Sequence, residues 1–332
     1  MRTICVGLGR GPHIAALRRR NPGPGEIAIK TEASLISAGT ELHYISKLRN
    51  GVERFPLGYC AAGYVSSVGD PTGGDLAGRR VIAIGWQQAI HAEHIVVNKR
   101  LVVPLPDDVS FQEGVFAGLA ATGVHAVHRA NQEGEERVLI IGLGLVGQLV
   151  AQIARPLSSK VVGLEPIQSR REIAAKCGID AVYAGFADLP DGRFDRIYFC
   201  ISGEATLAIQ NAVSRMTRMA DLQPRGVIVA VGRFDAKVSF APEMGNVDFR
   251  YASRCGTGYR HPDYERGIID LRPPSGEDTV DGNLRTALQL IAESRLDIRS
   301  LLSHEIPFDS AAEAYKLLME DNTALGVVLR YS

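Results

Sequence analysis

Residues 138–147 carry the clearest chemical signal in this chain. Four apolar residues are followed at once by glycines spaced G-x-G-x-x-G, and a helical apolar pattern begins at Gln148. A dinucleotide needs this order, because Gly142 permits a tight turn, Gly144 lets the backbone approach a pyrophosphate, and Gly147 lets helix and strand pack closely. N–H groups at a helix start also attract phosphate. The run predicts a dinucleotide site; the alternative is a glycine-rich turn in an unrelated α/β domain.

The acid that ends the next apolar run bears on the choice of dinucleotide. Glu165 closes residues 160–165, about twenty residues after the glycines, where a carboxyl group binds ribose hydroxyls and repels a 2′-phosphate. This favours NAD(H) over NADP(H), although Arg170 and Arg171 follow closely and weaken the preference. We expect the cofactor site to comprise Gly142, Gly144, Leu145, Val146, Gly147, Glu165, Arg170, Ser202 and Gly232.

The composition excludes several classes of partner. The chain has 332 residues, with 37 basic and 37 acidic residues, so no net charge favours nucleic acid or an anionic membrane. No segment has the length of a membrane span or the apolar core of a signal peptide. The five cysteines are odd in number and never spaced C-x-x-C, which indicates reduced thiols. We therefore expect a cytoplasmic protein that acts on a small molecule.

Two patterns divide the chain. Residues 1–124 contain short β-rich runs (26–30, 63–68, 80–84 and 94–97), which predict a small barrel. From residue 125 strands alternate with helices, with strands expected at 138–141, 160–165, 194–201 and 226–232, which predicts a doubly wound parallel sheet. The tail is expected to give helices at 283–294 and 310–318 and a strand at 326–329. The polar stretch 256–282 is long for a connection, so it is either a lid or interface loop or a disordered excursion.

A barrel, a dinucleotide domain and a short return segment, in this order, resemble the medium-chain dehydrogenase/reductase superfamily, the relatives of zinc alcohol dehydrogenase. The sequences that carry the resemblance are 22–26 (PGPGE), 37–43 (SAGTELH), 56–63 (PLGYCAAG), 120–123 (AATG), the glycine fingerprint and 311–315 (AAEAY). The resemblance implies a GroES-like β-barrel catalytic domain over 1–124, completed by 303–332, and a Rossmann domain over 125–302. Within the superfamily, the chain most resembles zinc-free bacterial members, which cluster with sugar, cyclitol and natural-product dehydrogenases.

Three positions depart from the zinc-dependent pattern. Ala38 stands where the first ligand would be, Tyr59 where the histidine would be, and Gly118 where the third ligand would be. A catalytic zinc takes three protein ligands from Cys, His and carboxylate side chains. The resemblance therefore implies a zinc-independent member, in which Cys60 is a buried apolar residue and not a ligand.

Thr40 and His43 match the hydroxyl and imidazole that relay the alcohol proton in the zinc enzymes. An imidazole titrates near neutral pH and can pass a proton to solvent; the alternatives are a helix cap for Thr40 and an ordinary surface residue for His43. Tyr59 either polarises the substrate oxygen or fills the space left by zinc, and a phenol needs help to act as a base at pH 7. Glu41 is expected to pair with a nearby arginine.

The resemblance also places a substrate pocket and an interface. Trp86, His91 and His94 lie where zinc-free members form the pocket wall, and Arg254 stands in an arginine-rich segment that either receives an anionic or polyhydroxylated substrate or forms a salt-bridged interface. A homodimer is expected through edge pairing within 247–252.

Three functions remain open. The favoured one is a zinc-independent NAD(H)-dependent oxidoreductase that interconverts a secondary alcohol and a ketone on a polar ring. The second is an enoyl or quinone reductase. Thr40 and His43 favour the first function, because the reduction of a conjugated double bond forms no alkoxide that would need a proton relay. The third is a nucleotide-binding protein without turnover.

Overall fold

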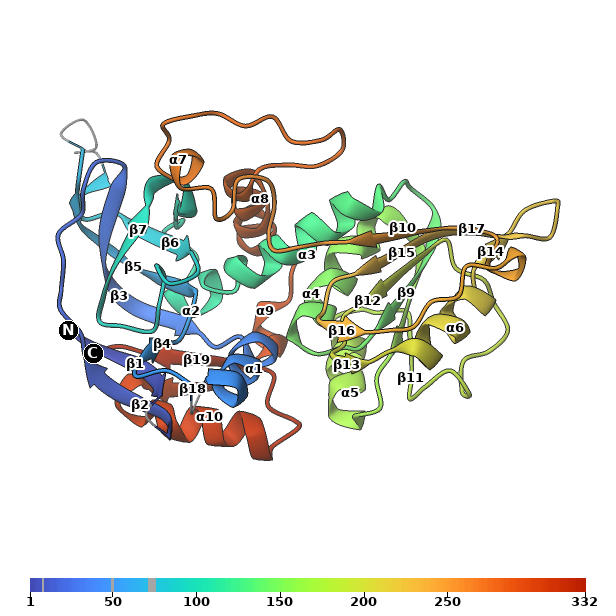
Figure 1. The fold of residues 1–332 in the computed structure, drawn as a ribbon, viewed down its shortest axis with the longest axis horizontal. Coiled ribbons are helices and arrows are strands. Elements are labelled where there is room, and N and C mark those ends of the chain that lie inside the picture. Colours follow the sequence, from blue (N-terminus) through green and yellow to red (C-terminus); the bar gives the residue numbers. More distant parts are fainter. Residues whose placement is uncertain (8, 49–50, 71–75) are drawn as a thin grey trace. The chain divides into compact units, whose positions relative to one another are not determined.

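The computed structural model describes residues 1–7, 9–48, 51–70 and 76–332, which form two compact units (Figure 1). The first unit comprises residues 1–121, 256–273 and 279–332, and the second comprises 122–255 and 274–278. Helix α3 (Ala117–Ala130) contains the boundary between them. None of the described helices has both the length and the apolar character needed to cross a membrane.

The first unit is rich in antiparallel strands. Its larger sheet has the order β18-β19-β3-β5-β6-β8, with β7 also paired to β3, and its smaller sheet has the order β2-β1-β4. The strands are β1 (Arg2–Gly7), β2 (Arg10–Ala16), β3 (Glu26–Leu35), β4 (Phe55–Pro56), β5 (Cys60–Val68), β6 (Arg80–Ile84), β7 (His94–Asn98), β8 (Val102–Pro104), β18 (Leu302–Pro307) and β19 (Gly326–Arg330). Each β-rich run expected from the sequence forms a strand of this unit.

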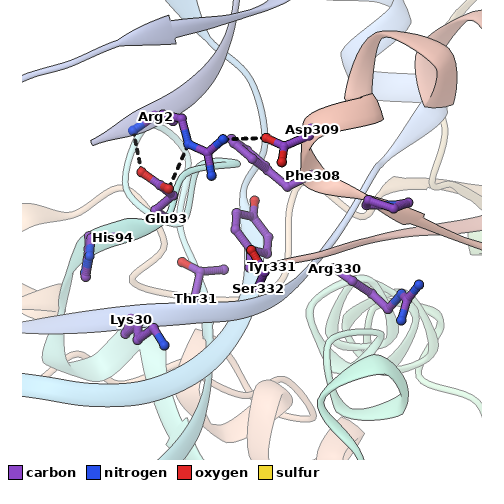
Figure 2. A pocket seen from close by; sticks show the side chains of 11 residues that line it. Arg2, Lys30, Thr31, Glu93, His94, Phe308, Asp309, Arg330, Tyr331 and Ser332 are labelled. Atoms are coloured by element: carbon purple, nitrogen blue, oxygen red, sulfur yellow. Dashed lines mark hydrogen bonds and ion pairs between the residues drawn. The ribbon is translucent and has the colours of Figure 1, made fainter.

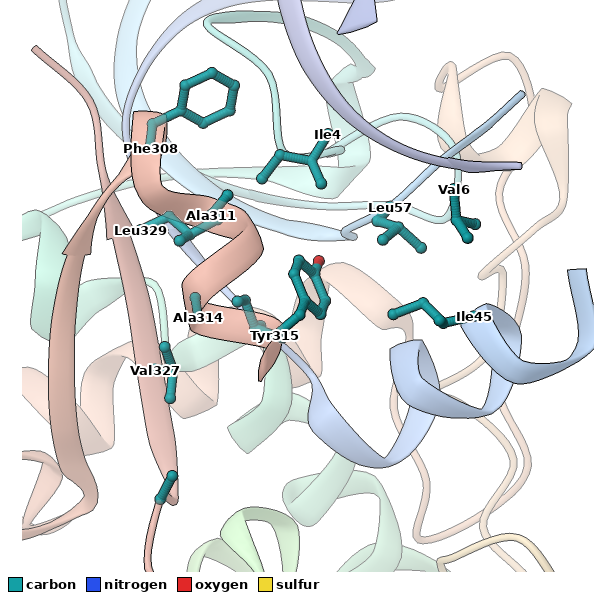
Figure 3. Close-up of a cluster of buried hydrophobic side chains, with 12 residues drawn as sticks. Ile4, Val6, Ile45, Leu57, Phe308, Ala311, Ala314, Tyr315, Val327 and Leu329 are labelled. Atoms are coloured by element: carbon teal, nitrogen blue, oxygen red, sulfur yellow. The ribbon is translucent and has the colours of Figure 1, made fainter. Parts of the chain in front are cut away.

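A cluster of buried apolar side chains joins the two ends of the chain in the first unit. Ile4 of β1, Leu57, Tyr315 and Leu329 of β19 belong to it, and each is at most 2% exposed (Figure 3). Burial of such side chains stabilises a fold by about 1.5–3 kcal/mol each. The helices of this unit are α1 (Ala38–Leu48), η2 (Lys99–Leu101), α2 (Phe111–Gly114), α7 (Pro262–Glu265), α8 (Val280–Ala292), α9 (Ile298–Leu301), η5 (Phe308–Ser310) and α10 (Ala311–Glu320).

The second unit is built on a mostly parallel sheet. Its order is β11-β10-β9-β12-β15, with β17 on β15 and the short antiparallel β14 also paired to β15. Counted along the chain, the parallel strands lie in the order 3-2-1-4-5-6, the Rossmann arrangement, which places ligands at the carboxyl ends of the strands. The strands are β9 (Glu136–Ile141), β10 (Ser158–Leu164), β11 (Ala181–Tyr183), β12 (Arg196–Phe199), β13 (Gly203–Glu204), β14 (Thr217–Arg218), β15 (Pro224–Ala230), β16 (Phe234–Asp235) and β17 (Asn246–Tyr251).

The middle strands of this sheet are buried on both faces, as apolar runs in parallel sheets are. Residues 138–141 of β9 are at most 6% exposed, and they pair with β10 on one side and β12 on the other. The helices of the unit are α4 (Leu145–Ala154), η3 (Arg155–Leu157), α5 (Gln168–Lys176), α6 (Thr206–Ser214) and η4 (Pro242–Met244).

The boundary after the Rossmann sheet differs from the expected one. The second unit was expected to continue to residue 302, but residues 256–273 and 279–302 belong to the first unit. The reason is packing, since α8 contacts β8, η2 and α2 of the first unit. The stretch 256–282 is ordered: it holds α7, and its Thr257 forms a bridge to Thr279.

Candidate functional site

The glycine turn of the second unit has the geometry that its sequence predicts. Gly142 has φ +88°, which favours glycine, and a Cβ on Gly147 would lie 1.9 Å from the Gly142 oxygen. Gly144 is the N-cap of α4 without any side-chain capping bond. A Cβ at Gly144 would meet no atom nearer than Nη1 of Arg170, at 4.0 Å. The helix start with Leu145 and Val146 is therefore left open to a phosphate.

Glu165 and Arg170 lie beside this turn. Glu165 follows β10 directly, is 3% exposed, and its Oε2 accepts a 2.8 Å bond from the N–H of Leu143 in the turn. Its Oε1 accepts from the N–H of Ile167 at 3.1 Å. Each carboxyl oxygen keeps a second lone pair, so hydroxyl donors can still be accepted. Arg171 instead donates to two backbone oxygens, those of Glu165 and Pro166.

Two further cofactor candidates follow neighbouring strands. Ser202 is exposed beyond β12, and Gly232 follows β15. A Cβ on Gly232 would lie 1.9 Å from the Ile201 oxygen, so a glycine is needed where these connections approach. The nine predicted cofactor residues lie in the connections after β9, β10, β12 and β15 or in the first turns of α4 and α5. Their contact with a nucleotide stays a prediction.

In the first unit, three hydroxyl groups lie together, and we call them the hydroxyl cluster: Ser37, Thr40 and Tyr59. The Tyr59 phenol donates a 2.6 Å hydrogen bond to Ser37 Oγ and lies 3.5 Å from Thr40 Oγ1. Ser37 and Thr40 lie at the start of α1, and Tyr59 lies immediately before β5. The preceding Gly58 has φ +95°, and a Cβ there would lie 2.6 Å from the His91 backbone nitrogen.

The phenol of the hydroxyl cluster is a donor and not a base. Burial is the main cause that raises the pKa of Tyr59 well above its usual range, and its hydrogen bonds to Ser37 and Thr40 only partly oppose this. The hydroxyl is therefore protonated at neutral pH. It can donate to a carbonyl or alkoxide oxygen that displaces Ser37 as the acceptor.

A buried network supports the cluster from below. Glu41 is 1% exposed; its Oε1 accepts from the N–H of Ser37 at 2.8 Å, and its Oε2 accepts from the Tyr315 hydroxyl at 2.5 Å. His91 Nε2 lies 3.1 Å from the same Oε2, and His91 Nδ1 lies 2.7 Å from Ser34 Oγ. Burial and the neighbouring Glu41 raise the pKa of Tyr315, so its hydroxyl is a donor here too.

This network corrects two expectations. Glu41 does not pair with an arginine, because its carboxyl is enclosed by Tyr315, His91 and the Ser37 amide. His91 is not part of a substrate wall: it is 0% exposed and both ring nitrogens are bonded inside the unit. Both side chains are buried beneath the hydroxyl cluster and support it.

The zinc positions of the resemblance do not fit a zinc ion. Ala38 offers no ligand, and the Tyr59 hydroxyl is bonded to Ser37. A Cβ on Gly118 would lie 2.5 Å from Cys60 Sγ, so the buried Cys60 occupies the space in front of the third position. In the part of the chain that the structure describes, no three His, Cys, Asp or Glu side chains are grouped so that they could hold a metal.

Next to the hydroxyl cluster lies a set of four rings that we call the aromatic wall: Tyr44, Phe55, Tyr59 and Trp86. The Trp86 ring centroid lies 4.6 Å from Tyr44, 5.8 Å from Phe55 and 6.2 Å from Tyr59. His43 of α1 packs edge-on against Tyr44 at 5.5 Å. The place of Trp86 in a substrate pocket stays a prediction. Arg254 belongs to the second unit and has φ +66°, and its role in substrate binding stays a prediction.

A cavity of about 230 Å³ in the first unit is lined by other residues than the hydroxyl cluster and the aromatic wall (Figure 2). Arg2 crosses it and binds Glu93 at 2.8 Å and Asp309 at 2.5 Å, while Arg330 pairs with Glu305. His94 lines this cavity, away from the position expected for it in the pocket wall. Because its charges are paired internally, we do not assign it a ligand.

The sequence has curated relatives among dehydrogenases, although no family model matches it. It is 24% identical over 242 residues to an uncharacterised zinc-type alcohol dehydrogenase-like protein of Escherichia coli, covering 71% of this chain and 62% of that protein. It is 28% identical over 238 residues to galactitol 1-phosphate 5-dehydrogenase of E. coli, covering 68% and 62%. With 2-dehydro-3-deoxy-L-galactonate 5-dehydrogenase of Pseudoalteromonas atlantica the identity is 26%, covering 66% and 58%. The matched regions span less than two thirds of each of these relatives.

Solved structures agree over the whole chain. Galactitol-1-phosphate dehydrogenase from E. coli superimposes with a TM-score of 0.79 at 19% identity, covering 99% of this chain and 100% of that one. Alcohol dehydrogenase TADH from Thermus sp. ATN1 gives 0.77 at 19% identity, covering both chains fully. This chain has the medium-chain dehydrogenase/reductase fold. Its relatives in sequence include zinc-type alcohol dehydrogenase-like proteins, sugar dehydrogenases and segments of mycobacterial polyketide synthases. The expected fold class is confirmed.

The sequence patterns do not predict every residue of this site. Ser37, which accepts from Tyr59, and Tyr315, which donates to Glu41, appear in the sequence only as members of motifs that carry the resemblance. A signal was present for Ser37, since it lies just before the start of α1. Tyr315 lies 274 residues from Glu41 along the chain, so no local pattern pairs them.

Proposed function

We propose that this chain is an NAD(H)-dependent oxidoreductase that interconverts a secondary alcohol and a ketone on a polar ring substrate without zinc. The observation that carries the proposal is the Tyr59 phenol, 2.6 Å from Ser37 and 3.5 Å from Thr40, at a position where zinc-dependent members hold a ligand. The open helix start at Gly144 supports the cofactor. The relatives named as sugar and polyol dehydrogenases support the substrate class.

Each residue has one task in this proposal. Gly142, Gly144 and Gly147 hold the pyrophosphate of the dinucleotide, which when bound accepts or supplies the hydride. Tyr59 donates a hydrogen bond to the substrate oxygen, which stabilises the charge that develops there as the carbon–hydrogen bond breaks or forms. Thr40 accepts the alcohol proton as it gives up its own hydroxyl proton, and His43, further along α1, receives that proton and releases it to solvent.

Cofactor preference, assembly and location complete the proposal. Glu165 favours NAD(H), because a carboxyl beside the ribose repels a 2′-phosphate. Strand β17 pairs with β15 and has the exposed residues Phe249 and Tyr251, which supports a homodimer formed by edge pairing. None of the five cysteines, all of them among the described residues, forms a disulfide, which supports work in the reducing cytoplasm.

The decisive experiment compares Tyr59→Phe with Tyr64→Phe. Tyr64 lies on β5 in the same unit, is 40% exposed and packs on Phe111, so it is a matched control. With NAD⁺ and a panel of sugars, polyols and cyclitols, Tyr59→Phe is expected to lower kcat by about 10²–10³-fold with unchanged NADH affinity. Tyr64→Phe should keep the wild-type rate. An equal rate for Tyr59→Phe means that the ring only fills space.

The same compound panel tests the two alternative functions, a reductase and a nucleotide-binding protein without turnover, and a metal analysis tests the absence of zinc. Reduction of enones or quinones, with no alcohol oxidised, would favour the reductase. Saturable NADH binding without turnover of any compound would favour a nucleotide-binding protein. Elemental analysis that finds one zinc per chain, or activity that a chelator removes, would overturn the zinc-free mechanism.

A further inference from the structure

Arg260 is placed on the aromatic wall. Its guanidinium carbon lies 5.0 Å from the centroid of the Trp86 ring, in the range of a cation–π contact. The Tyr59 ring centroid lies 6.2 Å from the same indole. One side chain, Trp86, thus connects an exposed cation to the hydroxyl cluster.

The segment that carries Arg260 is held in a strained shape. Arg260 has φ +66°, which costs a residue with a Cβ about 1 kcal/mol or more. Its N–H donates at 2.7 Å to Oε1 of Glu265, which is 3% exposed. The other oxygen of Glu265 accepts from Gln88 at 2.9 Å and from Asn98 at 2.8 Å.

The neighbouring residue fastens the same segment to the aromatic wall. The backbone N–H of Trp86 donates to the Tyr259 hydroxyl at 2.9 Å. Gln88, which binds Glu265, lies two residues after Trp86 in the same turn. The position of Arg260 over Trp86 is therefore fixed by buried polar groups and does not depend on the exposed side chain alone.

Arg260 differs from the other stacked arginines of the first unit in its charge balance. Arg2 stacks on Phe308 and pairs with Asp309, Arg80 stacks on Phe111 and pairs with Asp107, and Arg100 stacks on Tyr264 and pairs with Asp270. Within the described ranges, no carboxyl group forms an ion pair with Arg260. Its forked N–H donors remain available, and such a fork matches the geometry of phosphate and carboxylate oxygens.

We propose that Arg260 and Trp86 form a subsite for an anionic oxygen group, a phosphate monoester or a carboxylate, on the substrate whose alcohol binds at the hydroxyl cluster. This inference rests on the proposed function and narrows its substrate class to anionic polyols and sugars. Arg260 binds the charged end, and Trp86 holds its guanidinium in place. The guanidinium carbon lies 5.0 Å and the Tyr59 ring centroid 6.2 Å from the same indole centroid, so one small substrate can reach both groups.

Tryptophan fluorescence tests the subsite without any turnover, because Trp86 is the sole tryptophan of the chain. Titration of the full chain with inorganic phosphate, with glucitol 6-phosphate and with gluconate should give a saturable change for at least one of them, and none with glucitol. Arg260→Gln should weaken that binding at least tenfold, and Arg260→Lys less. Arg295→Gln, an exposed arginine paired with Glu293, should leave it unchanged. No change with the three anions, or equal affinity in Arg260→Gln and wild type, overturns the subsite.

Kinetics separate the subsite from the proposed function. In a panel of phosphorylated, carboxylated and neutral polyols, Arg260→Gln should raise KM for the preferred anionic class by about 30-fold or more, with similar kcat. KM values for neutral compounds should not move. An anion-dependent fluorescence change without oxidation of any alcohol retains the subsite and rejects the proposed function. Alcohol oxidation with KM values that Arg260→Gln does not alter rejects the subsite and retains the function. A larger effect on phosphorylated than on carboxylated compounds identifies phosphate as the bound group.

Discussion

The glycine turn of the second unit and the hydroxyl cluster of the first unit are built in opposite ways. In the turn, backbone groups form the site: Gly144 leaves the start of α4 open, and Gly142 and Gly147 are in contact through main-chain atoms. In the hydroxyl cluster, side chains form the site, and Tyr59 and Ser37 are 22 residues apart in sequence. The turn thus depends on the absence of Cβ atoms, and the cluster depends on which side chains are present.

This difference indicates which positions of each site tolerate substitution. A site formed by backbone groups tolerates few substitutions at its glycines, but the side chains around it can vary. A side-chain site can differ in its chemistry: at Tyr59 and Gly118, two positions where the resemblance places zinc ligands, a phenol bonds to Ser37 and a glycine packs against Cys60. A second layer of side chains, Glu41 with Tyr315 and His91, holds the start of α1 in place.

The largest expected effect separates packing from binding within the glycine turn. Gly147→Ala places a Cβ 1.9 Å from the Gly142 oxygen, so α4 must move, and we expect a loss of about 3 kcal/mol or more in the free energy of unfolding. Gly144→Ala meets no atom within 4 Å other than Arg170 Nη1 at 4.0 Å, so the fold should be kept. NADH affinity should nevertheless fall at least tenfold, since the Cβ lies where phosphate approaches. Urea unfolding and NADH titration of both variants measure these effects. An equal loss of stability in both variants would contradict the assignment.

The second largest effect is a loss of stability of the second unit at acid pH, caused by His125. Burial lowers the pKa of His125 on α3 to about 4, from 6.5 in an unfolded chain. The folded state therefore favours the neutral ring. The contribution of this ring to the free energy of unfolding is complete above pH 6.5 and is lost as the pH falls towards 4. The difference corresponds to about 3 kcal/mol. Urea midpoints at pH 7 and pH 5 should differ more in the wild type than in His125→Gln, and equal differences would contradict the prediction.

The two sites also differed in how far the sequence predicted them. The glycine turn, Glu165 and the strands around them could be placed because a strand, a turn and a helix follow one another along the chain. Thr40, Tyr59 and Trp86 come from the resemblance, and their roles stay predictions. His91 and Glu41 differ from the expectation, since their partners Ser34 and Tyr315 come from β3 and α10 and the contacts exist only after folding. The arginine-rich segment is visible in the sequence, but Arg260 does not stand out within it, because its place depends on a buried Glu265 that fixes the backbone.

The third effect tests the support beneath the hydroxyl cluster. Glu41→Gln keeps the size of the side chain but adds an N–H group where Glu41 now only accepts, facing Tyr315, His91 or the Ser37 amide. We expect a loss of about 2 kcal/mol in the free energy of unfolding, the range for a disturbed buried polar group. Denaturant unfolding measures it, and Glu313→Gln on the exposed face of α10 is the control. A Glu41→Gln variant as stable as Glu313→Gln would show that the network does not hold α1.

The smallest effect concerns Glu165, a side chain that is bonded to the glycine turn. Glu165 accepts from the Leu143 amide and lies where a ribose would bind, so its carboxyl both shapes the turn and repels a 2′-phosphate. Glu165→Gln keeps an acceptor oxygen but removes the charge. The ratio of NADPH to NADH affinity should rise by about five- to tenfold, which corresponds to about 1 kcal/mol. Glu172→Gln, on the exposed side of α5 and bonded to Gln168, should leave the ratio unchanged. A wild-type protein that already binds NADPH tenfold more tightly than NADH would instead assign the selection to Arg170, whose Nη1 lies beside Gly144.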